Sequence, residues 1–176
     1  MLNTIKTTLG YVVTLVSKYT PLNFEQDSLE GIYNYLPIND RLTTSGQPTA
    51  SQFKHIKEQG FELVINLAPH DAENAIKDEA GTVERLGMKY IHLPVNFQKP
   101  SERKFATFVN IMEDSQDKKI WLHCAANMRV SAFLYRYRTE HRNMPDKEAK
   151  TDLYKIWQPV AVWSEFIKAG PAKTMD

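Results

Sequence analysis

"WLHCAANMRVSAFLYRYR", residues 121–138, holds the only cysteine of the chain, Cys124, with a histidine before it and an arginine five positions after it. The segment that leads into it, "KKIWLH" at residues 118–123, predicts a short strand that ends just before the cysteine. Residues 130–143 predict a long helix. A cysteine that joins a strand to a helix in this way lies at the carboxyl end of the strand, where α/β proteins bind ligands.

The rest of the chain alternates between strand and helix patterns. Two extended pieces, residues 32–40 and 41–47, flank a turn at Asn39-Asp40, and the segments 61–68 and 88–95 predict further strands. Helical spacing marks the residues between and after them: 48–60, 74–87, 100–116, 145–157 and a last short helix that ends at Lys168. We therefore expect an α/β fold with a mostly parallel central sheet and helices on both faces.

Three of these helices carry more specific signals. Thr49 and Gln52 match a capping box at the start of the first. The helix at 74–87 is expected to bury Ile76, Ala80, Val83 and Leu86. The helix at 100–116 is expected to start from a Ser101 cap and to bury Phe105, Phe108, Val109 and Met112.

Length and composition indicate one folded domain. The chain has 176 residues, of which 42% are hydrophobic and 24% are charged. We expect an N-terminal appendage with a short amphipathic helix over residues 1–24, a single domain over 25–170 and a tail over 171–176. The apolar run at residues 9–17 is too short to span a membrane and lacks the cleavage site of a secretory leader. We therefore expect a cytoplasmic protein.

Charge and residue counts exclude several other classes. A net charge of +1 argues against a nucleic acid or an anionic membrane as partner. A single cysteine excludes an internal disulfide. The five histidines show no paired ligand spacing, so we expect neither a metal nor another cofactor. Nothing in the pattern indicates an oligomeric state.

The loop after Cys124 has the ingredients of an anion site. Its backbone N–H groups and those of the following helix turn converge on one small space, which favours an anion. The same field favours the thiolate of Cys124, which is the nucleophilic form. Arg129 adds a planar fork of donors, and Ser131 adds a hydroxyl. We expect the anion to be bound by Ala125, Ala126, Asn127, Met128, Arg129 and Val130.

This stretch resembles the signature loop of the cysteine-dependent protein-tyrosine and dual-specificity phosphatases: His-Cys, five residues, Arg, then Ser or Thr. Together with "LTTSGQPTASQF", "GFELVINLAP" and "LGMKYIHLPV" it resembles a family of small bacterial proteins identified as candidate phosphatases, over most of the chain after about Ser28. The resemblance implies that His123 polarises the loop and that Cys124 attacks phosphorus. It also implies that Arg129 binds phosphate and that Ser131 eases departure of the thiolate.

The loop departs from that pattern in its spacing. Four residues, not five, separate Cys124 from Arg129, and Asn127 stands where the family usually has glycine. Asn tolerates the left-handed backbone that glycine supplies. Either Val130 occupies the usual arginine position and Arg129 is turned away by about 100°, or the loop is one residue shorter. A shorter loop resembles the sulfur-carrying loop of rhodanese-type sulfurtransferases.

The general acid is a second departure. Phosphatases of this kind usually take an Asp from a loop after an earlier strand, but the matching "VNFQKPSE" has no Asp, and its carboxylate is Glu102. The other candidates are Asp71 and His70, which follow the preceding strand. We name Asp71 as the acid.

These observations together predict a metal-independent cysteine phosphatase, a hydrolase that acts on a phosphorylated substrate. Two alternatives stay open at this point. The first is a sulfurtransferase that carries a persulfide on Cys124. The second is a catalytically weak domain that binds a phosphorylated or anionic partner.

Overall fold

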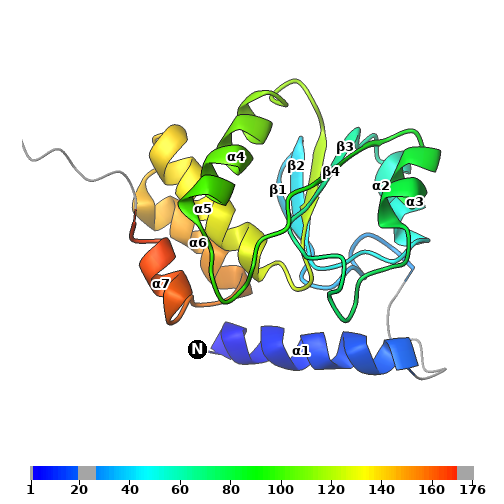
Figure 1. The fold of residues 1–176 in the computed structure, drawn as a ribbon, viewed down its shortest axis with the longest axis horizontal. Helices are drawn as coiled ribbons and strands as arrows, with labels where there is room; N and C mark the ends of the chain where they lie inside the picture. The colour runs from blue at the N-terminus through cyan, green and yellow to red at the C-terminus, as the bar shows by residue number, and fades with distance from the viewer. Residues whose placement is uncertain (1, 20–26, 170–176) are drawn as a thin grey trace, which may run out of the picture.

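The structure is a computed structural model that describes residues 2–19 and 27–169 (Figure 1). Within these ranges one sheet contains β1 (Leu36–Asn39), β2 (Leu42–Ser45), β3 (Leu63–Asn66), β4 (Lys89–His92) and β5 (Ile120–His123). The helices are α1 (Leu2–Tyr19), α2 (Gln52–Glu58), α3 (Glu79–Arg85), α4 (Glu102–Glu113), α5 (Met128–His141), α6 (Asp146–Ile156) and α7 (Val162–Phe166).

The sheet is mostly parallel, as predicted. Its strand order is β1-β2-β5-β3-β4, and β1 and β2 form an antiparallel hairpin at one edge. The other neighbours are parallel. Ser45 and Asn66 both pair with His123. The carboxyl ends of β2, β3 and β5 therefore lie side by side at one end of the strands. Cys124 follows His123 directly.

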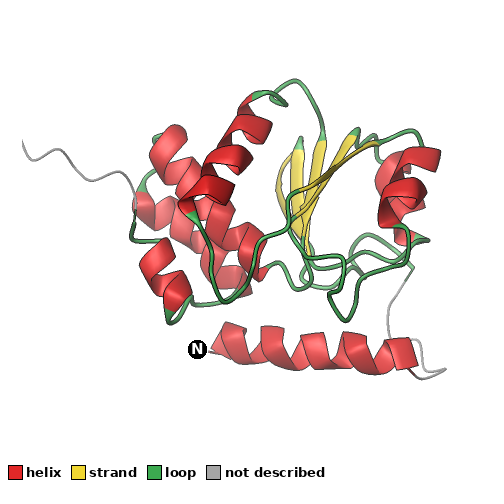
Figure 2. Ribbon diagram, viewed as in Figure 1, coloured by secondary structure: helices red, strands yellow, loops and turns green. Residues whose placement is uncertain are grey.

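Helices cover both faces of the sheet (Figure 2): α2 and α3 lie on one face, and α4 to α7 lie on the other. Side chains alternate along β5 accordingly. Trp121 packs with the core beneath α2 and α3, and Leu122 packs with the larger core beneath α4 to α7. By the same alternation His123 faces α2, where its ring contacts Phe53, and Cys124 belongs to the larger core.

The local helix predictions were largely confirmed. Thr49 and Gln52 form the capping box, because Gln52 Oε1 accepts from Thr49 N at 2.9 Å and Thr49 Oγ1 accepts from Gln52 N at 3.2 Å. The four apolar positions predicted for α4 are buried, and the Ser101 side chain accepts a hydrogen bond from Lys104 N.

The predicted start of the helix at 74–87 was wrong. Regular helix begins only at Glu79, after Asp78, whose φ of 53° is left-handed and whose side chain accepts from Gly81 N. Ile76 therefore lies before the helix, although it still packs against the core beneath α2 and α3. The segment ahead of α3 is a turn, and its Asn74 Nδ2 donates to Ala125 O in the loop after β5.

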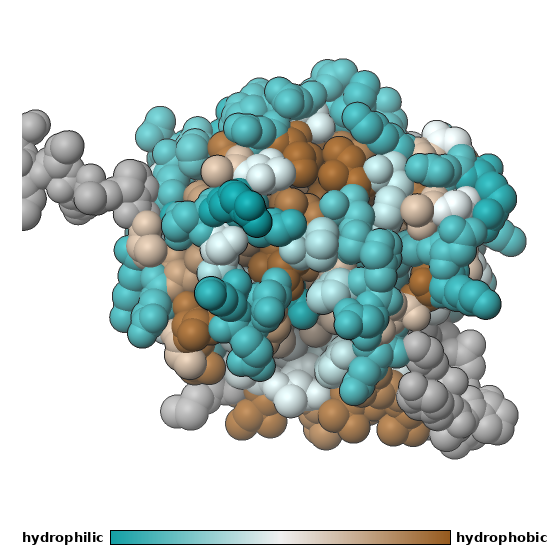
Figure 3. Space-filling model, in the orientation of Figure 1, coloured by the Kyte–Doolittle hydropathy of each residue, from teal (hydrophilic) through white to brown (hydrophobic). Residues whose placement is uncertain are grey.

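The helix predicted within residues 1–24 is α1, which runs across the molecule on the side where the strands end (Figure 1). Residues 20–24, like the predicted tail at 171–176, lie outside the described residues. The outer face of α1 is apolar and exposed at Leu2, Ile5, Leu9, Val12 and Val16. Figure 3 shows this hydrophobic surface along the lower edge of the molecule. No described helix is long and apolar enough to cross a membrane.

Candidate active site

Cys124 is fully buried at the start of a short loop that joins β5 to α5. The loop turns at Asn127, whose φ of 63° confirms the predicted left-handed backbone. The Asn127 side chain fastens the turn, because Nδ2 donates to Asn34 O at 2.9 Å and to Thr44 Oγ1 at 3.0 Å. Strand β2 and the segment before β1 thereby hold the cysteine loop in place.

The carbonyl groups of the loop are bonded to its surroundings. Ala125 O accepts from Gln47 N at 3.3 Å and from Asn74 Nδ2 at 2.9 Å, and Ala126 O accepts from Asn34 Nδ2 at 2.9 Å. In contrast, five backbone N–H groups donate no hydrogen bond to another group of the described chain: those of Ala125, Ala126, Met128, Arg129 and Val130. Several of them belong to the first turn of α5, where the helix dipole is positive. This arrangement leaves donors free for an anion.

Arg129 and Cys124 line the same cavity, of about 300 Å³. The Arg129 guanidinium lies over the Phe97 ring, with Cζ 5.2 Å from the ring centroid. Its Nε is buried and has no hydrogen-bond partner within the described residues. Val130 instead packs into the core with no exposure. Arg129 therefore lines the cavity instead of turning to solvent. Which of the two residues corresponds to the arginine of the family pattern stays a prediction.

Parts of the chain that the sequence analysis did not single out form the other walls of the cavity. Its lining consists of Thr7, Thr8, Tyr11, Phe97, Cys124, Ala125, Ala126, Met128 and Arg129. Two of the residues predicted to bind an anion, Asn127 and Val130, are buried and do not line it. The backbone of Phe97 is held by Trp163, because the Phe97 carbonyl accepts a hydrogen bond from Trp163 Nε1 at 2.8 Å.

His123 is buried on the other side of β5, beside a carboxylate from α3. Its Nε2 lies 3.1 Å from Glu79 Oε1. The same carboxylate accepts hydrogen bonds from Asn66 Nδ2 at 2.7 Å, from Tyr90 OH at 2.8 Å and from Gln47 Nε2. Burial alone would raise the pKa of Glu79, but the adjacent His123 and the donors of Gln47 and Tyr90 outweigh it and hold that pKa at about 2. Glu79 is thus a buried anion directly behind the histidine of the loop.

Ser131 is buried in the first part of α5 but does not line the Cys124 cavity. Its Oγ donates to Met128 O at 3.0 Å and accepts from Trp157 Nε1 at 3.2 Å. The hydroxyl therefore already holds the helix start to the end of α6. The role that the family resemblance implies for it stays a prediction.

The structure does not bring the predicted acids to the cavity wall. Asp71 and His70 are exposed, and the His70 ring lies against that of His92 with centroids 3.7 Å apart. Glu102 pairs with Arg136, with 2.7 Å between Oε1 and Nη1. Asp71 as general acid therefore stays a prediction without a contact to support it.

A different carboxylate from the same turn lies near the cavity. The pKa of the Tyr11 hydroxyl is raised by burial first and then by the charge of Glu73, while Arg129 lowers it and Cys124 raises it again. Tyr11 is thus close enough to all three groups to respond to their charges. Glu73 is two residues from Asp71 in the turn that follows β3.

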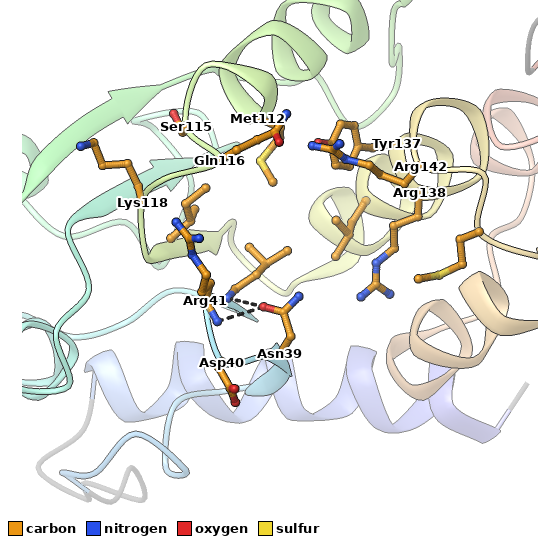
Figure 4. Close-up of a pocket in the computed structure, with 14 residues that line it drawn as sticks. Asn39, Asp40, Arg41, Met112, Ser115, Gln116, Lys118, Tyr137, Arg138 and Arg142 are labelled. Atoms are coloured by element: carbon orange, nitrogen blue, oxygen red, sulfur yellow. Dashed lines mark hydrogen bonds between the residues drawn. The ribbon is translucent and has the colours of Figure 1, made fainter.

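A larger hollow, of about 520 Å³, lies at the amino ends of β2 and β5 (Figure 4). Three of its four cations have counterions: Arg138 with Asp152, Arg142 with Glu113, and Lys118 with Asp117. The fourth is Arg41. No cysteine or histidine lines it. Despite its size, it therefore lacks the cysteine that a phosphatase of this kind requires. Nowhere in the described ranges do three or more His, Cys, Asp or Glu side chains gather as metal ligands would.

Comparison with known proteins decides the family. Residues 14–166 match the family described as "DSP-PTPase phosphatase fused to NAD+ Kinase". The chain belongs to this phosphatase family. The resemblance predicted from the sequence is therefore confirmed.

Solved structures agree with this phosphatase fold. The crystal structure of a candidate phosphatase (DUF442) from Shewanella putrefaciens CN-32 is 30% identical, with a TM-score of 0.73, over 80% of this chain and 92% of that one. The catalytic domain of the PP-IP phosphatase SIW14 from S. cerevisiae shares the fold, with a TM-score of 0.68 at 14% identity, over 81% of this chain and 88% of that one.

Curated relatives match a smaller region. A beta-lactamase hydrolase-like protein from Agrobacterium fabrum is 30% identical over 96 residues. That match covers 53% of this chain but only 22% of the length of the relative.

Proposed function

We propose that this chain hydrolyses a phosphomonoester through a cysteinyl-phosphate intermediate on Cys124. One observation carries the proposal: a single cavity is lined by Cys124, by the Arg129 side chain and by loop residues with unbonded amides, namely Ala125, Ala126 and Met128. The free amides and the amino end of α5 favour both a thiolate and a bound phosphate. Arg129 adds a planar pair of donors that fits two phosphate oxygens.

In the first step the Cys124 thiolate attacks phosphorus and forms an S–P bond, while the ester P–O bond breaks. The electron pair of that bond goes to the leaving oxygen, which takes a proton from water or from an acid. Since none of the predicted acids lines the cavity, substrates with a good leaving group are expected to react fastest.

In the second step water attacks phosphorus and the S–P bond breaks, with its electrons returning to sulfur. Inorganic phosphate leaves, the water proton is released, and the thiolate is restored. The loop amides and Arg129 stabilise the negative charge on the equatorial oxygens in both steps. His123 and Ser131 contribute in this scheme by holding the loop, through Glu79 and through Met128 O respectively.

The proposal is tested with 4-nitrophenyl phosphate, whose leaving group needs little protonation, and separately with thiosulfate plus cyanide. We expect phosphate release by the wild type and none by Cys124→Ser, since a serine hydroxyl stays protonated at neutral pH. Thiocyanate formation without phosphate release would instead support the sulfurtransferase, which the short Cys-to-Arg spacing favours. Phosphate binding without either turnover would support a binding domain.

A further inference from the structure

The helix α1 closes one side of the cavity that contains Cys124. Thr7, Thr8 and Tyr11 of α1 line it opposite residues of the cysteine loop, α5 and the loop before α4. Figure 1 shows α1 lying across the side of the molecule on which α5 begins. The family match starts at residue 14, so these three residues lie outside it.

Specific hydrogen bonds dock α1 at both of its neighbours. Toward α6 and the segment after it, Thr7 Oγ1 donates to Ile156 O at 2.6 Å, and Thr4 Oγ1 accepts from Gln158 N at 2.9 Å. Toward β1, Tyr33 OH donates to Thr7 O. The docking also depends on a small residue: a Cβ on Gly10 would lie 2.6 Å from Tyr33 Cε2. This contact leaves no room for a side chain.

The docked helix controls how much space is left over the nucleophile. Cys124 has no exposed surface, and the cavity of about 300 Å³ is at the lower end of the range for ligand pockets, about 300–1,000 Å³. Apart from Arg129 and two threonines, its lining is aromatic or apolar. Tyr11 is the aromatic side chain that α1 contributes to this lining, and Phe97 is the other aromatic residue in it.

We propose that α1 is a wall of the active site that selects small phosphomonoesters with a compact apolar group and excludes phosphorylated protein segments, with Tyr11 as the specificity-determining residue. This inference rests on the proposed function. The organic group of the substrate lies between Tyr11 and Phe97 while its phosphate occupies the loop. A peptide would require α1 to leave its place, at the loss of the bonds to Ile156, Gln158 and Tyr33.

The test compares phenyl phosphate with a short peptide that contains phosphotyrosine. Both have a phenol as leaving group, so general-acid effects cancel and only bulk differs. We expect wild type to favour phenyl phosphate in kcat/KM by at least about a hundredfold. Tyr11→Ala should reduce that ratio at least about tenfold. Gly10→Leu should do the same, because it displaces α1 without replacing any lining residue. Leu9→Ala, on the exposed face of α1, should leave the ratio unchanged.

A wild-type ratio within about threefold of unity would overturn the inference, and so would a ratio that neither Tyr11→Ala nor Gly10→Leu changes. Circular dichroism of each variant verifies that it is folded.

Equilibrium binding of the same two ligands to Cys124→Ser separates the inference from the proposed function, because it requires no turnover. One outcome is that wild type hydrolyses neither ligand, while Cys124→Ser binds phenyl phosphate more tightly and loses that preference when Tyr11→Ala is added. The phosphatase proposal then fails, and the role of α1 as a selective wall is supported. If Cys124→Ser binds both ligands equally, the wall fails whatever the turnover.

Discussion

The guanidinium of Arg129 lies over the ring of Phe97, with Cζ 5.2 Å from the ring centroid, on the wall of the cavity that holds Cys124. The ring supports the cation on one face without using its N–H donors. Nε is buried and has no hydrogen-bond partner within the described residues. The arginine is therefore held in place with donors to spare, as a residue that binds an oxyanion requires.

Arg129→Lys should lower kcat/KM for 4-nitrophenyl phosphate by about a hundredfold or more, a loss of about 2.7 kcal/mol of transition-state binding. The physical reason is that a point-charge ammonium cannot reproduce a bidentate fork of donors. Arg103→Lys, at an exposed position on α4, is the matched control and should have no effect. An Arg129→Lys enzyme within about threefold of wild type would show that another group binds the phosphate.

Asn127→Gly and Asn127→Ala should separate two roles of this residue in thermal unfolding. Both variants lose the side-chain bonds to Asn34 O and Thr44 Oγ1. Alanine, unlike glycine, is also strained in the left-handed backbone at a φ of 63°, which lowers the free energy of unfolding by about 1–2 kcal/mol. We therefore expect Tm to fall in the order wild type, glycine variant, alanine variant. An alanine variant as stable as the glycine variant would mean that the turn does not keep this conformation.

Glu79→Gln should make the protein less stable and change how its stability depends on pH. The folded-state pKa of Glu79 is about 2, below its ordinary value of 4.5, so the folded state favours the ionised form. That contribution is fully present above pH 4.5 and is lost as the pH falls from 4.5 toward about 2. The variant should lack this part of the acid transition. It should also lose about 2 kcal/mol near pH 7, because the amide is uncharged and keeps only one acceptor oxygen, so that donors to the other oxygen lose their partner.

Urea unfolding of both proteins from pH 7 down to the acid limit measures this difference. Glu84→Gln, which removes an exposed carboxylate of the same helix, serves as the control and should follow wild type. Parallel acid transitions in wild type and Glu79→Gln would contradict the account of the buried carboxylate.

Patterns within one segment were sufficient to predict most of the fold. The apolar run at 61–68 predicts β3, and the spacing of Phe105, Phe108, Val109 and Met112 predicts the buried face of α4. These signals depend on a period of two or of about 3.6 residues, which each segment carries in itself. The strand–Cys–helix order likewise predicts that Cys124 lies at the carboxyl end of β5, the central strand.

The parts of the site that the sequence did not reveal depend on contacts between distant segments. Glu79 reads as a polar helix position, and its burial results from donors on three other segments: Gln47, Asn66 and Tyr90. Tyr11 reads as an interruption of an apolar run. The pattern of α1 did contain a signal for this contact. Thr7 and Tyr11 lie on one face of the helix and the exposed apolar residues lie on the other, so the face with Thr7 and Tyr11 must pack against the rest of the protein.

The covalent intermediate on Cys124 is the central claim, and one measurement tests it most directly. Rapid mixing with excess 4-nitrophenyl phosphate, an acid quench and peptide mass spectrometry would locate any phosphoryl group on the protein. The account predicts a phosphoryl adduct on the peptide that contains Cys124, formed at a rate at least equal to turnover and absent from Cys124→Ser. Steady phosphate release by wild type with no adduct at any time point, or with unchanged turnover in Cys124→Ser, would contradict it.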